Sequence, residues 1–554
     1  MSSPFALQLG TNYCPRDDEL PQIQALLIEP SQRLKNLDDE IAVIRKALDK
    51  LSEERNALSA YVEGHRALMA PIRRLPLDIL EEIFVACLPS HRNCVMSAEE
   101  APVILGRICS SWRTISLATP RLWSRLHIVE PRSPEPSNPL HTSRRLLRLE
   151  VANSWLRRSG ECPLSISLDS SADPRMSPPV SSPVSPTNPD LFLSALIQFA
   201  PRWQNLNLVT QQSALKTLSR VTENDVPLLQ ELTIICLTNT RRTDDAPWSL
   251  SQSMASVLHG PSLSAISISG STAKASELPL RWSQLTALSF LGSAWGTEHV
   301  QTCGVLLEIL SWCPKLRTCS LLIDEPPGDL THSIVECPFL HTLYLFCVSA
   351  AVHTSGSLLN RLSLPNLREF TLHGQETVQD GDPSTTNSLT SALAASPRLE
   401  NIRIASESFT KSTLIDFLRG LSSTVRHLEI KEPIHMVWRL EPAFDDHVLT
   451  ALTTYCPALQ ELVLLSCHNV SDEALLCFII SRKPALKRIQ VKFPRERQVD
   501  ILPSIQSFAA DGLESSITYK EISKPLNTPQ SSPWHGLSDA PPHSSWQPWY
   551  DDYY

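Results

Sequence analysis

The sequence has little that would suit an enzyme, a membrane protein or a secreted protein. It contains no GxxxxGK[ST] loop, no GxGxxG after a strand, no HExxH and no GxSxG, which are motifs that build common catalytic sites. Its longest apolar runs, such as residues 475–480, are far too short to span a bilayer. The N-terminus lacks the basic and apolar regions of a secretory signal. We therefore expect no catalysis, no cofactor and no membrane partner.

Cysteine is present without a pattern, and basic charge is not in excess. The 14 cysteines form no CxxC pair, and the 16 histidines show no metal-ligand spacing with them. We expect packing roles for the cysteines, with reduced thiols and a cytoplasmic or nuclear location; nothing marks a thioester-forming nucleophile. The formal net charge of −9 argues against nucleic acid as the main partner, because a phosphate-binding surface needs an excess of Lys and Arg.

Glycine is scarce, with 16 residues, whereas the 44 prolines cluster and mark the boundaries between regions. A chain of 554 residues has room for two or three domains. Three Ser-Pro dipeptides within 170–190 fit proline-directed phosphorylation, although such dipeptides are common in any linker of this composition. We expect a disordered N-terminus (1–28), a coiled-coil-like helix (29–69), a small helical module (70–129), a linker with a helix and a disordered Ser/Pro-rich segment (130–190), a repeat region (191–519) and a disordered tail (520–554).

The tail is rich in aromatic residues, which could form a short peptide motif or be inert. They are Trp534, Trp546, Trp549, Tyr550, Tyr553 and Tyr554.

Residues 29–69 carry a heptad pattern, which is typical of a coiled coil. Pro71 must end this helix. In a parallel dimer the charges at the g and following e positions would match for Glu40 and Arg45, but not for the other two g–e pairs. Two alternatives stay open: the helix dimerises or, as we favour, it folds back on a neighbouring helix of the same chain. The apolar positions, which only Arg55 interrupts, are Leu34, Leu37, Ile41, Ile44, Leu48, Leu51, Leu58 and Val62.

Residues 70–129 predict three short helices. The first begins at Pro76, where a missing N–H costs nothing, and it carries one apolar stripe. A polar loop over 89–102 follows, then a second helix over about 103–112. Thr119 and Pro120 form an N-cap and an N1 proline that open the third helix. The apolar residues of interest in these helices are Leu75, Pro76, Ile79, Leu80, Ile83, Phe84, Leu105, Ile108, Cys109, Trp112, Leu122 and Trp123.

The Leu-Pro start of the first helix, Cys109-x-x-Trp112-Arg113 and the closing Pro120-x-Leu122-Trp123 together resemble an F-box. Family members use this module to dock on the Skp adaptor of a cullin ubiquitin ligase. The order of coil, Leu-Pro helix and Trp-Arg segment is similar to F-box proteins that are abundant in mushroom-forming fungi. The resemblance implies that the apolar residues named above divide between the core of the module and the adaptor interface.

The sequence departs from the F-box pattern in a few places. Asp78 stands where glutamate is usual, and Ile108 where valine is usual. The loop between the first two helices is longer than in compact examples, so it either contains an inserted helix or is a flexible loop.

From residue 191 to 519 the unit Pro-x-Leu-x-x-Leu-x-Leu recurs, with helical patterns between its copies. The clearest copies start at Pro314, Pro338, Pro365, Pro397 and Pro457. One strand and one helix in about two dozen residues is the signature of a leucine-rich-repeat solenoid; an ordinary α/β domain with coincidental leucines is the alternative. Residues 456–475 are similar to the cysteine-containing repeats of F-box proteins, but the irregular repeat lengths argue against a perfectly regular horseshoe.

In each repeat strand the leucines point inward, and the residues beside them point to the concave side of the solenoid. That face is predicted to be mostly polar and mixed in charge, which suits a protein target better than lipid or a polyanion. Its predicted members are Thr318, Ser320, Thr342, Tyr344, Glu369, Thr371, Asn401, Arg403, His427, Glu429, Glu461, Arg488 and Gln490.

The predicted fold class is therefore mixed α and α/β: a coiled-coil-like helix, a small helical F-box module and a solenoid of strand-helix units. The resemblance implies the substrate-recognition subunit of an SCF-type cullin ubiquitin ligase, with the Skp adaptor, cullin and an unknown target protein as partners. One competing interpretation is a leucine-rich-repeat scaffold that acts without a ligase. Another is an enzyme with an unrecognised site, which would need clustered titratable residues with shifted pKa values in a deep pocket.

Overall fold

The computed structural model of the chain divides into two compact units, Met1–Ile83 and Phe84–Tyr554. The Ser-Pro dipeptides within 170–190 and most of the aromatic tail lie outside the residues that the structure describes. Those residues are 3–131, 139–170, 190–237, 250–270, 275–291, 302–323, 333–348, 351–374, 383–432, 442–509, 512–520, 532–534 and 537.

The first unit consists mainly of one long helix, α1 (Leu20–Leu68, 49 residues). It begins inside the region for which the sequence predicts no order, and it runs through Pro30. A proline in its first turn is compatible with this early start, because that position needs no backbone N–H. A short 3-10 helix, Pro71–Arg74, follows, and Pro71 thus lies just beyond the helix end, as predicted.

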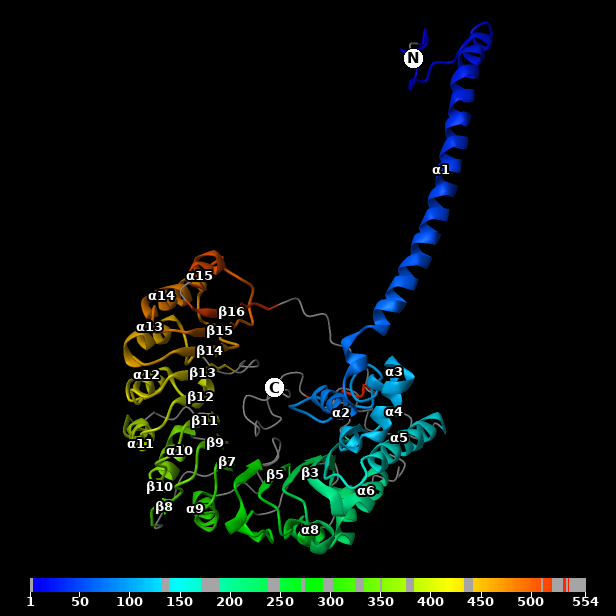
Figure 1. Cartoon of the computed structure of the whole chain (residues 1–554). Coiled ribbons are helices and arrows are strands. Elements are labelled where there is room, and N and C mark those ends of the chain that lie inside the picture. Colours follow the sequence, from blue (N-terminus) through cyan, green and yellow to red (C-terminus); the bar gives the residue numbers. More distant parts are fainter. Residues whose placement is uncertain are drawn as a thin grey trace. The chain divides into compact units, whose positions relative to one another are not determined.

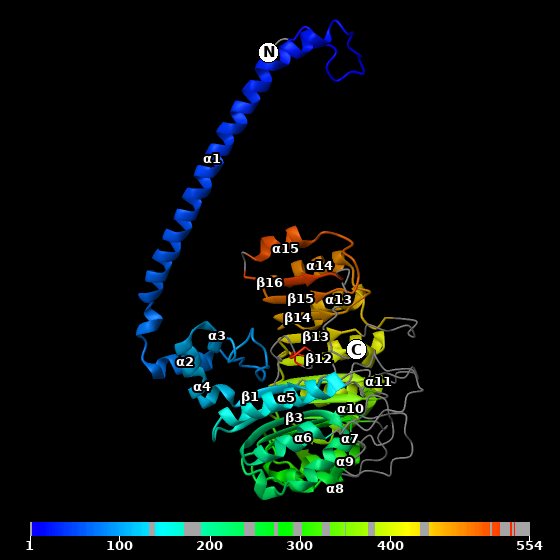
Figure 2. The same ribbon diagram turned by 90° about the vertical axis from the view of Figure 1, so that its right-hand side faces the viewer.

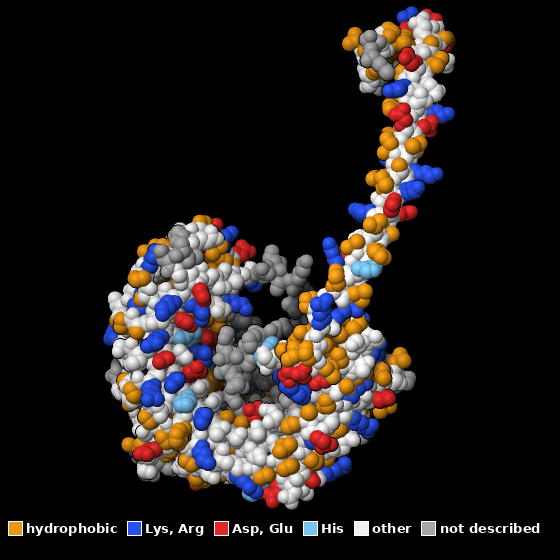
Figure 3. Space-filling model, viewed as in Figure 1, with side chains coloured by type: hydrophobic (Ala, Val, Ile, Leu, Met, Phe, Trp, Pro, Cys, Tyr) orange, Lys and Arg blue, Asp and Glu red, His pale blue; other side chains and the backbone are white. Residues whose placement is uncertain are grey.

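No residue of α1 is buried. Its heptad side chains are exposed between charged ones along the length of the helix (Figure 3). Within the described part of the first unit, α1 thus does not fold back on another helix, contrary to what the sequence analysis favoured. Among residues 3–83 no other helix matches its length, because the other elements there are the 3-10 helix of 4 residues and the start of α2 (Leu77–Ala86, 10 residues).

The predicted second helix of the 70–129 module is in fact two helices, α3 (Leu105–Ile108) and α4 (Ser110–Ala118). The break lies at Cys109, whose backbone is extended (φ −156°, ψ 170°). Cys109 acts as the N-cap of α4, since its Sγ accepts the backbone N–H of Trp112 at 3.5 Å. The third predicted helix is the 3-10 turn Pro120–Trp123.

The second unit is built on a 14-stranded sheet in which each strand pairs in parallel with the next one along the sheet. Two further strands, β8 (Val335–Glu336) and β10 (Leu362–Ser363), form a separate pair. The sheet begins inside the segment predicted as the F-box and continues through the predicted linker. Its strands are β1 (Arg125–Val129), β2 (Leu164–Asp169), β3 (Trp203–Gln211), β4 (Glu231–Leu237), β5 (Ala265–Ser269), β6 (Ala287–Leu291), β7 (Thr318–Ile323), β9 (Thr342–Cys347), β11 (Glu369–Gly374), β12 (Asn401–Ala405), β13 (His427–Lys431), β14 (Glu461–Leu465), β15 (Arg488–Lys492) and β16 (Glu514–Thr518).

Helices connect the strands and cover one face of this sheet, with the strands on the inner side of the curve and the helices on the outer side (Figures 1 and 2). A parallel sheet whose strands add in sequence order, each with its own return segment, is the architecture of a leucine-rich-repeat solenoid. The helices are α5 (Pro139–Arg158), α6 (Leu191–Leu196), α7 (Gln212–Leu215), α8 (Leu250–Leu258), α9 (Cys303–Trp312), α10 (Ala351–Leu359), α11 (Pro383–Ala394), α12 (Lys411–Arg419), α13 (Asp446–Tyr455), α14 (Asp472–Arg482) and α15 (Leu502–Ala509).

Among the residues described, no helix has both the length and the apolar character that crossing a membrane requires.

The leucines of the repeat form the core between strands and helices. In β14 the side chains of Leu462 and Leu464 are fully buried, and their register partners in β13, Leu428 and Ile430, are fully buried as well. Because each strand buries its apolar positions only against its neighbours, the rungs make one continuous core.

The polar loop at 89–102 neither contains an inserted helix nor is a flexible loop without contacts. Val95 forms a parallel bridge with His127 of β1, and the backbone N–H of His127 donates to the Cys94 carbonyl at 2.7 Å. Cys94 and Val95 are fully buried. The loop therefore covers the free edge of β1, where unpaired backbone groups would otherwise be exposed.

Candidate functional site

Helix α2 has two apolar faces. Leu80 and Phe84, one turn apart, are buried, whereas Leu77, Ile79 and Ile83 are 57, 45 and 36 % exposed. A helix that is apolar on both sides needs a second partner for its exposed face. Of the predicted adaptor-binding residues on this helix, Ile79 and Ile83 are thus accessible to another protein.

Other predicted residues are buried, and four of them, Phe84, Leu105, Leu122 and Trp123, belong to the core of the second unit. The ring of Phe84 packs on Trp112, with centroids 4.8 Å apart. The indole of Trp123 donates to the Ser116 carbonyl at 2.7 Å and meets Trp155 edge-on at 4.8 Å. The buried set of predicted residues is Leu80, Phe84, Leu105, Leu122 and Trp123.

The remaining predicted residues are accessible to different degrees. In the second unit Ile108 is 57 % exposed and Cys109 is exposed, while Trp112 is half-buried. In the first unit Pro76 is exposed and Leu75 half-buried. The predicted residues thus include both buried and accessible side chains, as the implied division between core and interface requires.

Sequence reasoning missed three exposed apolar residues near these positions. Leu77 lies on α2, Ile104 directly precedes α3, and Leu117 lies on α4; their exposed fractions are 57, 39 and 46 %. Helical periodicity does not predict the exposure of Leu77, because its spacing to Leu80 and Phe84 places it on the same side of the helix as these buried residues. Periodicity gives no signal for the exposure of Ile104 and Leu117 either.

The predicted concave-face residues lie in two neighbouring rows across the sheet. The first row joins Thr318, Thr342, Glu369, Asn401, His427, Glu461 and Arg488 by strand register. The second row, two positions further along each strand, joins Ser320, Tyr344, Thr371, Arg403, Glu429, Val463 and Gln490. Residues in one row stand on one face of the sheet. Ser320 and Thr371 are buried; for the rest, target binding stays a prediction.

Charged groups in these rows compensate one another. Arg403 lies between two carboxylates, with Nη1 at 3.7 Å from Glu369 Oε2 and Nε at 3.3 Å from Glu429 Oε2. Asn401 Nδ2 also donates to Glu369 Oε1 at 3.2 Å. This end of the face therefore presents a fixed mixture of positive and negative groups rather than a field of one sign, and such a mixture suits a polar protein surface.

Pairing between side chains of neighbouring strands continues from β13 to β16. His427 Nδ1 is 3.1 Å from Glu461 Oε2. Arg488 bridges two strands, with Nη1 at 3.3 Å from Glu461 Oε1 and Nε at 2.9 Å from Glu514 Oε2. Arg488 and Gln490 are exposed, so this region is the more accessible part of the two rows.

Buried cysteines in the second unit are poor nucleophiles. Burial raises the pKa of the Cys94, Cys236 and Cys313 thiols to about 12, and it raises the pKa of Cys467 well above its usual range. A thiol with so high a pKa holds its proton at neutral pH and does not attack. These residues therefore act in packing.

Within the described ranges, no group of three or more His, Cys, Asp or Glu side chains is arranged to hold a metal ion. Two surface depressions of about 640 Å³ each occur. One is lined by α5 residues such as Glu150 and Arg157; the other is lined by turns between repeats, such as Pro397 and Pro457.

Comparisons with known proteins find similar structures but do not show which family the chain belongs to. No family model matches the chain, and no curated protein matches it. Among solved structures, the chain is similar to the complex of Rad7 and Elc1 from yeast, with 15 % identity and a TM-score of 0.33, covering 60 % of this chain and 82 % of that one. It is also similar to a protein from Bacteroides fragilis, with 14 % identity and a TM-score of 0.25, covering 52 and 65 % of the two chains. A third similar structure is the TLR13–ssRNA13 complex, with 13 % identity and a TM-score of 0.25, covering 59 and 47 %.

Proposed function

We propose that this protein is the substrate-recognition subunit of an SCF-type ubiquitin ligase. In this proposal the segment 70–129 docks on the Skp adaptor and the solenoid holds a target protein. The observation that carries the proposal is the exposed apolar face of α2 formed by Ile79 and Ile83, which are one turn apart. Two large aliphatic side chains exposed side by side, close to a Leu-Pro motif, form a surface that suits another subunit.

The energetics are compatible with such docking. Full burial of an aliphatic side chain is worth about 1.5–3 kcal/mol, so covering the two half-exposed ones contributes on the order of 2 kcal/mol. Association costs about 4–15 kcal/mol. The α2 face is therefore an anchor rather than a whole interface, and the adaptor must gain further contacts elsewhere on the module, for which Ile108 is a candidate.

The solenoid would hold the target through the two rows of the concave face. Their paired charges select a partner by complementarity, because a like charge placed opposite a buried or half-buried group is costly. The protein itself would carry out no chemistry. It would raise the effective concentration of a target lysine near the conjugating enzyme that the ligase recruits, in the cytoplasm or the nucleus.

The second candidate function is a leucine-rich-repeat scaffold without a ligase. The observation in its favour is that the solenoid is built independently of the α2 face, since its core is continuous from β1 to β16. A scaffold would bind its targets equally well without an adaptor.

Affinity purification of the tagged full-length protein from cells distinguishes the two. We expect the Skp adaptor and cullin to co-purify with the wild type and to be lost with the double variant Ile79→Glu/Ile83→Glu. Leu228→Glu, at a 42 % exposed position outside the α2 face, is the matched control and should retain both. Absence of cullin from the wild-type sample would support the scaffold and contradict the ligase.

Leu80 and Phe84 are unsuitable for this test. Both are buried, and Phe84 packs on Trp112, so a charge at either position would disrupt the fold and remove binding for that reason alone.

A further inference from the structure

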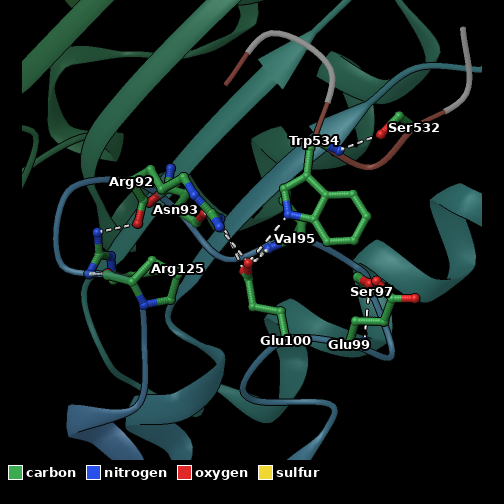
Figure 4. A network of polar contacts seen from close by, with 10 residues as sticks. Arg92, Asn93, Val95, Ser97, Glu99, Glu100, Arg125, Ser532 and Trp534 are labelled. Atoms are coloured by element: carbon green, nitrogen blue, oxygen red, sulfur yellow. Dashed lines mark hydrogen bonds and ion pairs between the residues drawn. The ribbon is translucent and has the colours of Figure 1, made fainter. Parts of the chain in front are cut away.

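A short C-terminal segment, residues 532–534, lies against the loop that joins α2 to α3 (Figure 4). The indole Nε1 of Trp534 donates to Glu100 Oε2 at 3.4 Å, although the two residues are 434 positions apart. The backbone N–H of Trp534 donates to Ser532 Oγ at 3.3 Å, and the Leu537 N–H donates to the Trp534 carbonyl at 3.1 Å. Trp534 is half-buried.

The carboxylate that receives the indole is held in place by the loop itself. The Arg92 guanidinium donates to both Glu100 oxygens, and the Val95 N–H donates to Oε1 at 3.2 Å. Burial raises the pKa of Glu100, but Arg92 and the Val95 N–H outweigh it, so the pKa lies below its usual value. Glu100 is therefore an ionised, oriented acceptor at neutral pH.

The loop is in turn fixed to the first two strands. Arg125 of β1 donates to the Pro89 carbonyl at 2.8 Å and to the Arg92 carbonyl at 2.6 Å. Asn93 exchanges hydrogen bonds with two serines of β2, donating to Ser167 Oγ at 3.1 Å and accepting from Ser165 Oγ at 2.9 Å. A site anchored in this way is formed before a ligand arrives, which lowers the cost of binding.

We propose that residues 92–100 form a binding site for a Ser-Pro-Trp segment, and that residues 532–534 of the same chain occupy it. Each ligand residue has a physical role. Tryptophan offers an apolar ring with a single N–H donor, which the Glu100 carboxylate accepts. Proline fixes the backbone in front of it, and the serine hydroxyl closes the turn that presents the indole.

This contact ties the end of the solenoid to its beginning. The described stretch that follows β16 ends at Lys520, and the description resumes at Ser532; about a dozen residues reach at most about 40 Å. The tail therefore acts as a clasp between the last repeat and the loop that covers β1. A linker this short also gives the segment a high effective concentration at its site.

Hydrogen exchange on the full-length protein tests the clasp. In Trp534→Ala the amides of 92–100 should exchange several-fold faster than in the wild type, because the covering segment is lost. Trp546→Ala removes a different tryptophan of the tail and is the matched control, which should leave these amides unchanged. Equal exchange of 92–100 in the wild type and Trp534→Ala would overturn the proposal.

A rescue experiment tests the ligand chemistry separately. A synthetic peptide of residues 529–540, added to the Trp534→Ala protein, should restore slow exchange at 92–100. The same peptide with alanine in place of tryptophan should not. Equal protection by both peptides would show that the site does not recognise the indole. Neither result depends on the proposed ligase function.

A second, independent observation concerns the exposed seam of α1, defined as Leu34, Leu37, Ile41, Ile44, Leu48, Leu51, Leu58 and Val62. These side chains are 38–66 % exposed. A helix gains most of its stability by packing an apolar face, and α1 packs none. Covering two such seams is worth on the order of 15 kcal/mol before costs, which matches or exceeds the about 4–15 kcal/mol that association requires.

We infer that a second copy of this chain covers the seam as a parallel coiled coil. Leucine occupies three of the four d positions, and β-branched Ile41 and Val62 share the a positions with Leu34 and Leu48; the d leucines with Ile41 and Val62 favour two parallel strands. In that arrangement Glu40 faces the partner's Arg45. The single charged a residue, Arg55, fixes the register at some cost in stability.

Light scattering of the full-length protein tests this inference with two adjacent residues. The wild type should have about twice the chain mass of 61.7 kDa, and Ile44→Glu, in the seam, should be monomeric. Val43→Glu is the control, because Val43 is 69 % exposed but lies outside the seam. A monomeric wild type, or equal disruption by both variants, would contradict the dimer.

Discussion

Asp472 shows how one buried carboxylate can hold several segments together. It is fully buried and accepts from the backbone N–H groups of Gln498 and Val499, each at 2.8 Å. Its other oxygen pairs with Arg495 Nη2 at 2.9 Å and accepts from the Tyr519 hydroxyl at 3.2 Å. The Asp472 carboxylate thus links the start of α14 to the loop after β15 and to the residue after β16.

We predict that Asp472→Asn lowers the free energy of unfolding at pH 7 by about 2–3 kcal/mol, because bonds to a charged acceptor are lost. Burial raises the pKa of Asp472, but Arg495 and the two N–H groups lower it by more. The pKa of Asp472 in the folded protein is therefore below its usual value. The stabilisation is therefore present above the usual Asp pKa of about 4 and is lost as the pH falls through the lower folded value.

Chemical denaturation of both proteins between pH 7 and pH 3 measures this effect. The difference between wild type and variant should shrink as the pH falls below about 4. A difference that stays constant over this range would contradict the assignment of the charge to Asp472.

The sequence could place α2 but could not say which of its sides is covered. Leu80 and Phe84 are as apolar as Ile79 and Ile83, and periodicity treats all of them as one stripe. Which pair is buried depends on contacts such as that of Phe84 with Trp112, which are distant in sequence. The resemblance implied that these residues divide between the core and the interface, and which of them bind the adaptor stays a prediction.

Strands that carry the Pro-x-Leu pattern were predictable because local sequence and packing agree. The copies at Pro314, Pro338, Pro365, Pro397 and Pro457 each precede a strand of the sheet, β7, β9, β11, β12 and β14. The strand β1 was missed as part of the sheet, since Pro120-x-Leu122 ahead of it was assigned to the F-box. The role of the 89–102 loop at the edge of β1 depends on Val95 meeting His127. A polar loop has no periodicity that could reveal such pairing.

A core leucine and an exposed residue of neighbouring strands should respond very differently to truncation. Leu462 of β14 is fully buried, so Leu462→Ala should lower the free energy of unfolding by about 2–5 kcal/mol. Gln490 of β15 is exposed, so Gln490→Ala should change it by less than about 0.5 kcal/mol. Thermal and denaturant unfolding of both variants measure this; comparable losses would contradict the rung structure.

The whole chain combines a solenoid with a mixed-charge inner face and a helix that leaves an apolar side uncovered. The solenoid could be predicted because its repeat is visible in the sequence. The docking surface could not be predicted, because an exposed apolar face is defined by what the rest of the protein leaves uncovered. The contact between Trp534 and Glu100 is even less predictable from the sequence, since the two residues are 434 positions apart.

The most direct test of the central claim is a titration of the purified full-length protein with a purified Skp adaptor, followed by calorimetry. We predict saturable binding by the wild type and by Leu228→Glu, and at least a tenfold weaker affinity for Ile79→Glu/Ile83→Glu with an unchanged circular dichroism spectrum. Equal affinity of the double variant and the wild type, or no binding by the folded wild type, would contradict the claim that the exposed face of α2 is the docking surface.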